Sequence, residues 1–250
     1  GLTHEPSAAR RCTLSKMSTR GVVAVVVLGA CRWGFDAPCD GTLIDSGRDA
    51  GPPPVSCMGL ASTCGQMGNG PCCESPLVDG GTYYRAYDVA VDMMYTDTTR
   101  PATVSTFRLD KYEVTVGRFR KFVEAGQGTQ ANPPAVDAGA HPNLGTSGWN
   151  PTWTSMLPAD TPALTASVGC GTWTAMPVAN ETLPMTCMGG FGSGWYVAMA
   201  FCVWDGGYLP TEAEWNYAAS GGSLQRAYPW SDPPESTTVD CSHGNYGGSN

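Results

Sequence analysis

The residues of this chain with the greatest capacity for chemistry are its eleven cysteines. A thiolate can bind a soft metal ion or act as a nucleophile, and two thiols can form a disulfide. No two cysteines have C-x-x-C spacing and no two histidines have H-x-x-x-H spacing, so a structural zinc site has little support. His141 and His243 are isolated in the sequence, and we interpret both as ordinary loop residues. Together with the export signal described next, the many cysteines indicate an oxidising compartment.

A short apolar run near the start of the chain predicts export. Residues 21–30 follow Arg20, and about ten residues are too few to cross a bilayer as a helix, so the run is typical of a secretory signal. It ends in Leu28-Gly29-Ala30-Cys31, which resembles a bacterial lipobox, so Cys31 is the predicted lipidation site. We therefore expect a bacterial lipoprotein held at a membrane by acyl chains, either periplasmic or at the cell surface. The alternative is a plain signal peptide followed by a chance cysteine.

The rest of the chain divides into a tether and a domain. Residues 1–30 are interpreted as upstream residues and the signal, residues 31–74 as a tether rich in Cys, Gly and Pro, and residues 75–250 as the domain. The tether is expected to form a small disulfide-stapled knot, although spacing leaves the connectivity open. Besides the predicted lipidation site Cys31, its cysteines are Cys39, Cys57, Cys64, Cys72 and Cys73. The formal charge of −8 disfavours a nucleic-acid partner.

The domain reads as a loop-rich α+β fold. Residues 81–84 and 103–109 are rich in β-branched or aromatic side chains and predict strands. Thr115 can cap a helix whose apolar residues recur at helical spacing up to Gly126. Residues 195–204 are apolar on nearly every side and predict a buried helix.

The sequence predicts two further features of the domain. The long stretch 127–185 lacks periodicity and is expected to form large ordered loops pinned by tryptophans, with Cys170 and Cys187 placed where they could pair. Thr211 and Glu214 have the spacing of a capping box, which predicts a helix that stops at the pair Gly221-Gly222. The tryptophans are Trp149, Trp153 and Trp173.

Three segments, in this order, resemble the sulfatase-modifying-factor or formylglycine-generating enzyme family. Residues 107–123 contain the run EVT, residues 195–207 end in FCVWDGG, and residues 208–222 contain LPTEAEW, followed by YPW at 228–230. The resemblance covers roughly residues 75–250. It implies a C-type-lectin-like fold of the formylglycine-generating enzyme type. It further implies oxidation, by copper and oxygen, of a client sulfatase cysteine to formylglycine.

The alternative function is a noncatalytic, surface-anchored binding lipoprotein on the same scaffold. A third idea, iron-dependent sulfur chemistry of the ergothioneine type, needs a histidine triad that this sequence does not contain. In the catalytic members of the family, the two copper-binding cysteines lie in a C-terminal part that has no counterpart in these residues. We therefore expect the chain to be a fragment, truncated at the C-terminus and inactive by itself, with no catalytic residue to name.

The resemblance also implies structural sites. The side chain of Asn245 and the carbonyl of Tyr246 match a segment that binds Ca²⁺ in the family, and oxygen donors suit that ion. The alternative is a turn asparagine followed by a packing aromatic residue. Cys202 matches a position that forms a structural disulfide with a cysteine much further along, and the odd number of domain and tether cysteines is expected to leave one unpaired. Tyr208 stands where the family usually has an arginine.

Overall fold

The computed structural model describes residues 32–33, 53–61, 63–65, 67–85, 87, 97–188 and 193–238. The chain divides into two units, and each is described by itself. The larger unit comprises residues 25–80 and 105–214, and the smaller unit comprises residues 1–24, 81–104 and 215–250. The architecture mixes helices, short strands and long loops, which agrees with the predicted loop-rich α+β class.

A small antiparallel sheet belongs to the larger unit. Its strands are β1 (Arg32–Trp33), β2 (Leu77–Val78) and β5 (Phe107–Leu109), in the order β1-β5-β2. The register places Arg32 opposite Leu109 and Val78 opposite Phe107. The strand β5 therefore lies in the centre and leads towards the first long helix.

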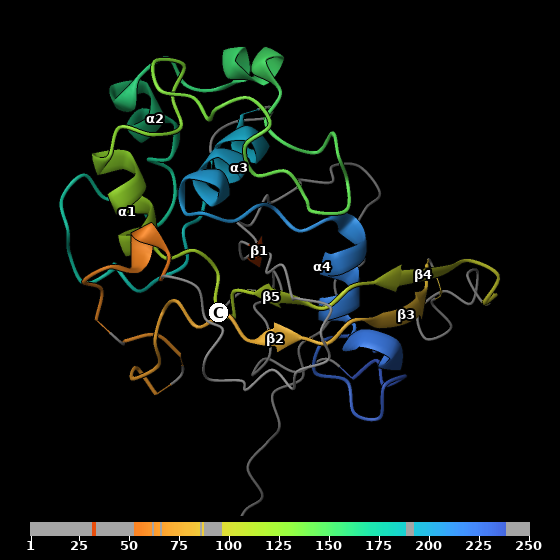
Figure 1. Ribbon diagram of the computed structural model, residues 1–250. Coiled ribbons are helices and arrows are strands. Elements are labelled where there is room, and N and C mark those ends of the chain that lie inside the picture. Colours follow the sequence, from red (N-terminus) through yellow and green to blue (C-terminus); the bar gives the residue numbers. More distant parts are fainter. Residues whose placement is uncertain are drawn as a thin grey trace, which may run out of the picture. The chain divides into compact units, whose positions relative to one another are not determined.

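The helices of the larger unit are short and separated by long loops, as Figure 1 shows for α1, α2 and α3. They are η1 (Val55–Cys57), α1 (Val116–Glu124), η2 (Pro151–Met156), α2 (Thr161–Ser167), α3 (Gly194–Trp204) and the start of α4 (Glu212–Ala219). The predicted cap of α1 is confirmed, since the Thr115 hydroxyl accepts a hydrogen bond from the Arg118 amide. The predicted stop is also confirmed, because Gly126 has a φ of +68°, which favours glycine.

The apolar core lies where α1 meets α3. The rings of Phe119 and Phe122 lie 6.1 Å and 5.4 Å from the ring of Phe201, so the aromatic face of α1 packs directly on the buried helix. The helix α3 is buried on nearly all sides, as predicted, although Trp195 at its start remains 43% exposed. Deleting one of these phenylalanine side chains would cost about 3–5 kcal/mol.

Tryptophans hold the long loop against this core, as the sequence predicted. Trp149 is fully buried, and Trp173 meets the ring of Phe119 edge to face. Arg120 of α1 reinforces the attachment, because its guanidinium lies 4.6 Å from the Trp173 ring centroid and pairs with Glu181 at 2.7 Å.

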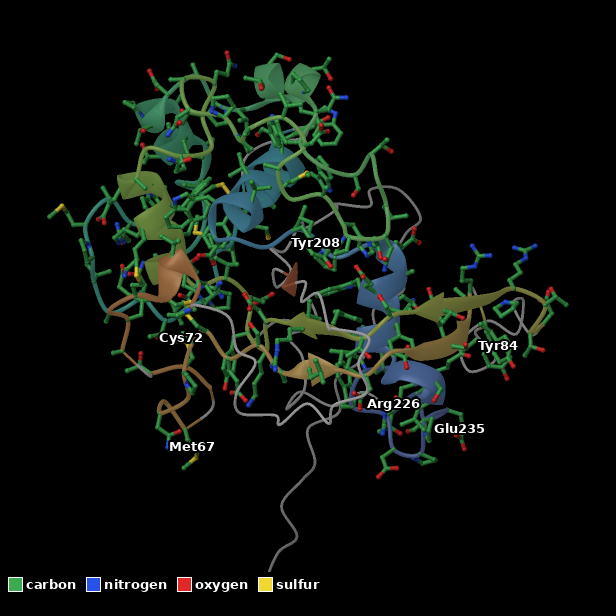
Figure 2. The ribbon with its side chains drawn as sticks, viewed as in Figure 1. Met67, Cys72, Tyr84, Tyr208, Arg226 and Glu235 are labelled. Atoms are coloured by element: carbon green, nitrogen blue, oxygen red, sulfur yellow. A yellow bond between two sulfur atoms is a disulfide. The ribbon has the colours of Figure 1, made fainter. Side chains whose placement is uncertain are left out.

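The smaller unit contains a two-stranded antiparallel sheet of β3 (Gly81–Tyr84) and β4 (Pro101–Val104). The ring of Tyr83 packs on Tyr217, at 5.8 Å between centroids. The side chain of Gln225, which follows η3 (Gly222–Leu224), exchanges two hydrogen bonds of 3.0 Å with the backbone of Tyr84. Tyr84 and Arg226, both in this unit, are labelled in Figure 2.

The single strand predicted over residues 103–109 is wrong in one respect. The run divides into β4 and β5, which belong to different sheets, with Ser105 and Thr106 between them. The hydroxyl of Thr106 accepts the Gly80 N–H at 3.0 Å, so a side chain takes the place of a ladder partner at the break. A threonine hydroxyl can accept a backbone hydrogen bond at a turn, although threonine is also a residue type that is common in strands.

The segment interpreted as a tether is in part a structural component of the larger unit. Residues 53–74 carry the disulfides Cys57–Cys73 and Cys64–Cys72, so the expected stapled knot is present here. Figure 2 shows Met67 at the outer tip of this loop, and its side chain is 82% exposed. Ser56, in contrast, is fully buried. The knot therefore packs as part of the fold.

Candidate functional site

The predicted site residues fall into two groups. Cys31, Asn245 and Tyr246, together with Cys39 and His243, lie outside the described residues. Cys170 and Cys187, which were expected to be able to pair, are joined by a disulfide with a Cα–Cα distance of 5.7 Å. Cys202 is fully buried and is disulfide-bonded as well.

The state of these cysteines bears on the copper that the resemblance implies. All seven cysteines in the described part of the chain are disulfide-bonded. A disulfide sulfur is not a thiolate, and Cu(I) prefers thiolates. The described cysteines therefore do not fit the role of copper ligands. In the same residues, no three His, Cys, Asp or Glu side chains gather as a metal site, and no described helix is long and apolar enough to cross a membrane.

The most highly charged buried feature in the described region is centred on Arg118 of α1. Its guanidinium donates to Asp110 Oδ2 and Asp205 Oδ2, both at 2.7 Å, and its Nε donates to the Ser56 hydroxyl at 2.8 Å. All three charged side chains are completely buried. Desolvation works against the charge on Arg118, but the two carboxylates outweigh it, so the pKa of Arg118 is raised above its ordinary value.

Ser56 completes this cluster, which we call the Arg118 network and define as Ser56, Asp110, Arg118 and Asp205. The Ser56 amide and hydroxyl donate to the two oxygens of Asp205, at 2.7 Å and 2.8 Å. Asp205 caps the C-terminal end of α3, and Asp110 directly follows β5. The Arg118 network thus joins the disulfide knot, the sheet, α1 and α3, and its role is to fix their positions.

A second buried polar pair involves the capping box. The Thr211 amide donates to Glu214 Oε2 at 2.8 Å, and the Glu214 amide donates to the Thr211 hydroxyl at 3.2 Å, which confirms the reciprocal cap. The other oxygen, Glu214 Oε1, lies 2.9 Å from His141 Nε2. One carboxylate therefore caps α4 and also holds the loop that carries His141.

His141 lies in a loop, as interpreted, but its ring is buried and hydrogen-bonded to residues of two segments. Its Nδ1 accepts a hydrogen bond from the Asn143 amide at 3.0 Å, so the ring proton of the neutral form belongs on Nε2, where it is donated to Glu214. The ring also meets Tyr208 edge to face at 5.3 Å, and Tyr208, labelled in Figure 2, is buried. Tyr208 thus packs against the His141 ring where the family usually has an arginine.

Both buried groups were missed from the sequence, although a weak signal existed. Arg118 lies on a helix whose buried residues are otherwise apolar except for Arg120, and Asp205 directly follows the apolar run of α3. A charge placed among buried positions requires a partner. Apart from Asp110, which is 8 residues from Arg118, the partners are distant in sequence. Ser56 is 62 residues from Arg118, and His141 is 73 residues from Glu214.

These features define a disulfide-stapled, loop-rich α+β domain in which charged side chains tie the elements together. The family profile described as the sulfatase-modifying factor enzyme 1-like domain matches residues 63–249. The match spans most of the chain, and the chain therefore belongs to this family. It begins twelve residues before the boundary expected at residue 75, within the disulfide knot.

Known relatives share parts of the sequence. A formylglycine-generating enzyme of Thermomonospora curvata is 32% identical over 145 residues, which is 52% of this chain and 43% of that protein. A formylglycine-generating enzyme of Mus musculus is 53% identical over 36 residues, 14% of this chain and 10% of that protein. The inactive Cα-formylglycine-generating enzyme 2 of Bos taurus is also 53% identical over 36 residues, 14% of this chain and 12% of that protein. The matched stretches thus span less than half the length of these relatives. No solved structure matches the chain.

Proposed function

We propose that the protein to which these residues belong oxidises a cysteine of a client sulfatase to formylglycine. The observation that carries this proposal is the family match over residues 63–249, together with 32% identity over 145 residues to a formylglycine-generating enzyme. The change replaces the –CH₂SH group of the client with –CHO and releases the sulfur as H₂S. With dioxygen as oxidant, two further thiols supply the remaining electrons and protons, and a disulfide and water are the other products.

In this proposal the described region acts as the scaffold. Its cysteines are all disulfide-bonded, and the three charged side chains of the Arg118 network are engaged with one another. Bound copper would supply the oxidising chemistry, and its ligands would be residues outside those described. The similarity to a relative named as inactive agrees with a separation between the described scaffold and the catalytic residues, because a shared scaffold does not by itself specify catalysis.

A peptide assay tests the proposal. The 250-residue chain and the complete reading frame that contains it would each be incubated with a C-x-P-x-R peptide, copper, dioxygen and a thiol reductant. We expect the aldehyde, detected by mass spectrometry, from the complete protein and none from the 250-residue chain. A peptide with serine in place of the cysteine is the matched control. If the complete protein is folded and loaded with copper but makes no aldehyde, the noncatalytic surface-anchored binding lipoprotein becomes the better description.

We also propose that the protein is exported and anchored to a bacterial membrane through Cys31. The disulfides of the described region support an oxidising compartment, because such bonds are rare in a reducing cytosol. A Cys31→Ala variant should move from the membrane fraction to the soluble fraction. Wild-type protein that is already soluble after export would contradict the anchor.

Calcium binding by Asn245 and the Tyr246 carbonyl remains a proposal that rests on the family resemblance. If it is correct, Ca²⁺ should raise the melting temperature of the complete protein, and Asn245→Ala should abolish that increase. Mg²⁺ is the control, since its smaller octahedral shell suits a different ligand set. An equal rise of the melting temperature with Ca²⁺ in the wild type and in Asn245→Ala would exclude the Asn245 side chain as a ligand.

A further inference from the structure

A pocket of about 350 Å³ lies beside the start of α1, within the larger unit. Three segments line it: the disulfide knot, the residues just before α1, and the long loop. The lining residues are Cys64, Gly65, Lys111, Tyr112, Glu113, Thr115, Thr182 and Pro184. Its volume falls at the lower end of the range for small-ligand sites. A site of this size would take a short organic group.

The walls of the pocket are fixed before any ligand arrives. The Cys64–Cys72 disulfide closes one wall, and the backbone bridge between Thr115 and Pro184 holds another. A Cβ atom at Gly65 would lie 2.6 Å from the Tyr112 hydroxyl, so the tyrosine packs tightly on the knot. Because these walls are held covalently and by hydrogen bonds, binding would require little ordering of the protein.

The polar groups around the pocket disfavour an anion. The first three N–H groups of α1 already donate to Leu183 O, Glu181 O and Thr115 Oγ1. The Lys111 ammonium is paired with Glu74 at 2.9 Å. The donors that an anion would need at a helix N-terminus are therefore occupied.

Glu113, in contrast, favours a cation in the pocket. Among the described residues, no hydrogen bond or ion pair reaches its carboxylate, and partial desolvation raises the pKa of Glu113 above its ordinary value of 4.5. The neighbouring Tyr112 ring already has the paired Lys111 ammonium 5.5 Å from its centroid, so this ring tolerates a cation nearby. Glu113 is nevertheless exposed, so a cation in the pocket would meet a carboxylate that water reaches but that no cation pairs with among the described residues.

We propose that this pocket binds an alkylammonium group, with Glu113 as the counter-ion and the Tyr112 ring as the apolar wall. The group could be carried by a free amine or by a lysine side chain of a peptide, and both share the same chemistry. The proposal does not rest on the oxidation described above, because none of the observations that support it concerns that reaction.

An NMR titration of the ¹⁵N-labelled 250-residue chain tests the site. The probe is n-butylammonium chloride, and 1-pentanol and butyrate serve as neutral and anionic controls of similar length. We expect saturable shifts of the amide signals of Gly65, Tyr112 and Glu113 with n-butylammonium, and none with either control. Absence of these shifts, or equal shifts with 1-pentanol, would overturn the proposal. Comparison with acetyl-Gly-Lys-Gly-amide then separates the sources: tighter binding of the peptide indicates a lysine side chain, and equal or weaker binding indicates a free amine.

Two matched pairs of variants locate the site. Glu113→Gln keeps the shape of the side chain but removes its charge, so we expect at least tenfold weaker binding, whereas Glu124→Gln, on the exposed end of α1, should leave binding unchanged. Gly65→Ala and Gly59→Ala replace glycines of similar positive φ, +83° and +73°, but only the first crowds Tyr112. Binding should therefore be lost in Gly65→Ala and kept in Gly59→Ala. Unchanged affinity in Glu113→Gln would exclude Glu113 as the counter-ion.

Discussion

Arg118 shows how a single buried charge can stabilise a fold that has little regular secondary structure. Its guanidinium is surrounded by two carboxylates and one hydroxyl from three other segments. A buried ion pair offsets its desolvation cost only when its geometry is good and its remaining groups are hydrogen-bonded. The Arg118 network meets both conditions, so its stability depends on every member being present.

The substitution Arg118→Met should therefore be strongly destabilising. It leaves Asp110 and Asp205 buried without their cation, and we expect a loss of about 3–5 kcal/mol in the free energy of unfolding. Urea denaturation followed by circular dichroism measures the change. Lys111→Met is the control, because the Lys111–Glu74 pair is exposed and should cost at most about 1 kcal/mol. Similar losses in the two variants would show that the Arg118 network is not the source of stability that we infer.

Glu113 predicts a dependence of stability on pH. Its pKa in the folded state is raised by desolvation, so the folded protein holds this proton more tightly than the unfolded chain does. The stability contributed by the neutral acid is present below pH 4.5 and is lost as the pH rises through the raised pKa. Glu113→Gln, which stays neutral, should therefore be more stable than wild type at pH 7 and equal to it in acid. Thermal melts from pH 3 to pH 8 measure this difference, and a constant difference across that range would contradict the assignment.

At the scale of elements, the start of α4 depends on one residue with two functions. Glu214 completes the capping box with Thr211 and also accepts from His141. Thr211→Ala removes only the hydroxyl cap and should cost about 1 kcal/mol. Glu214→Ala also removes the acceptor of a buried ring nitrogen, so we expect a larger loss, by about 1–3 kcal/mol. Chemical denaturation of the two variants gives the comparison, and a smaller loss for Glu214→Ala would show that the contact with His141 adds no stability.

The elements also show what a sequence can reveal. The caps at Thr115 and Thr211 and the glycine stops were predictable because their partners lie within a few residues. The pairing of His141 with Glu214 was not, since nothing local specifies which of several carboxylates a distant ring will meet. The division between β4 and β5 failed for a similar reason. Composition marks residues as suited to a strand, but the hydrogen bond from Gly80 to Thr106 sets where pairing stops.

At the scale of the whole molecule, disulfides compensate for the scarcity of long helices and strands. The bonds Cys57–Cys73 and Cys170–Cys187 close loops of similar length, with sequence separations of 16 and 17. In the chain-entropy account, each loop of this length contributes about 3 kcal/mol. Only the first, however, lies next to a member of the Arg118 network.

Removing each of these two disulfides separately should reveal that difference. The double variant Cys57→Ser/Cys73→Ser should lose more stability than Cys170→Ser/Cys187→Ser, because it also loosens the attachment of Ser56 to Asp205 and Arg118. Combining each pair of substitutions with Ser56→Ala in a double-mutant cycle measures the coupling. We expect coupling for the first pair and additivity for the second. Additivity in both cases would show that the knot and the Arg118 network are independent.

The oxidised state of the described cysteines has a practical consequence for finding the reactive thiols of this protein. An alkylating reagent applied to the native protein would find no thiol at the seven described cysteines, since each is disulfide-bonded. Any label incorporated without prior reduction would therefore mark a cysteine elsewhere. Peptide mapping of that label in the complete protein would then identify candidates for catalysis against a background free of signal from this region.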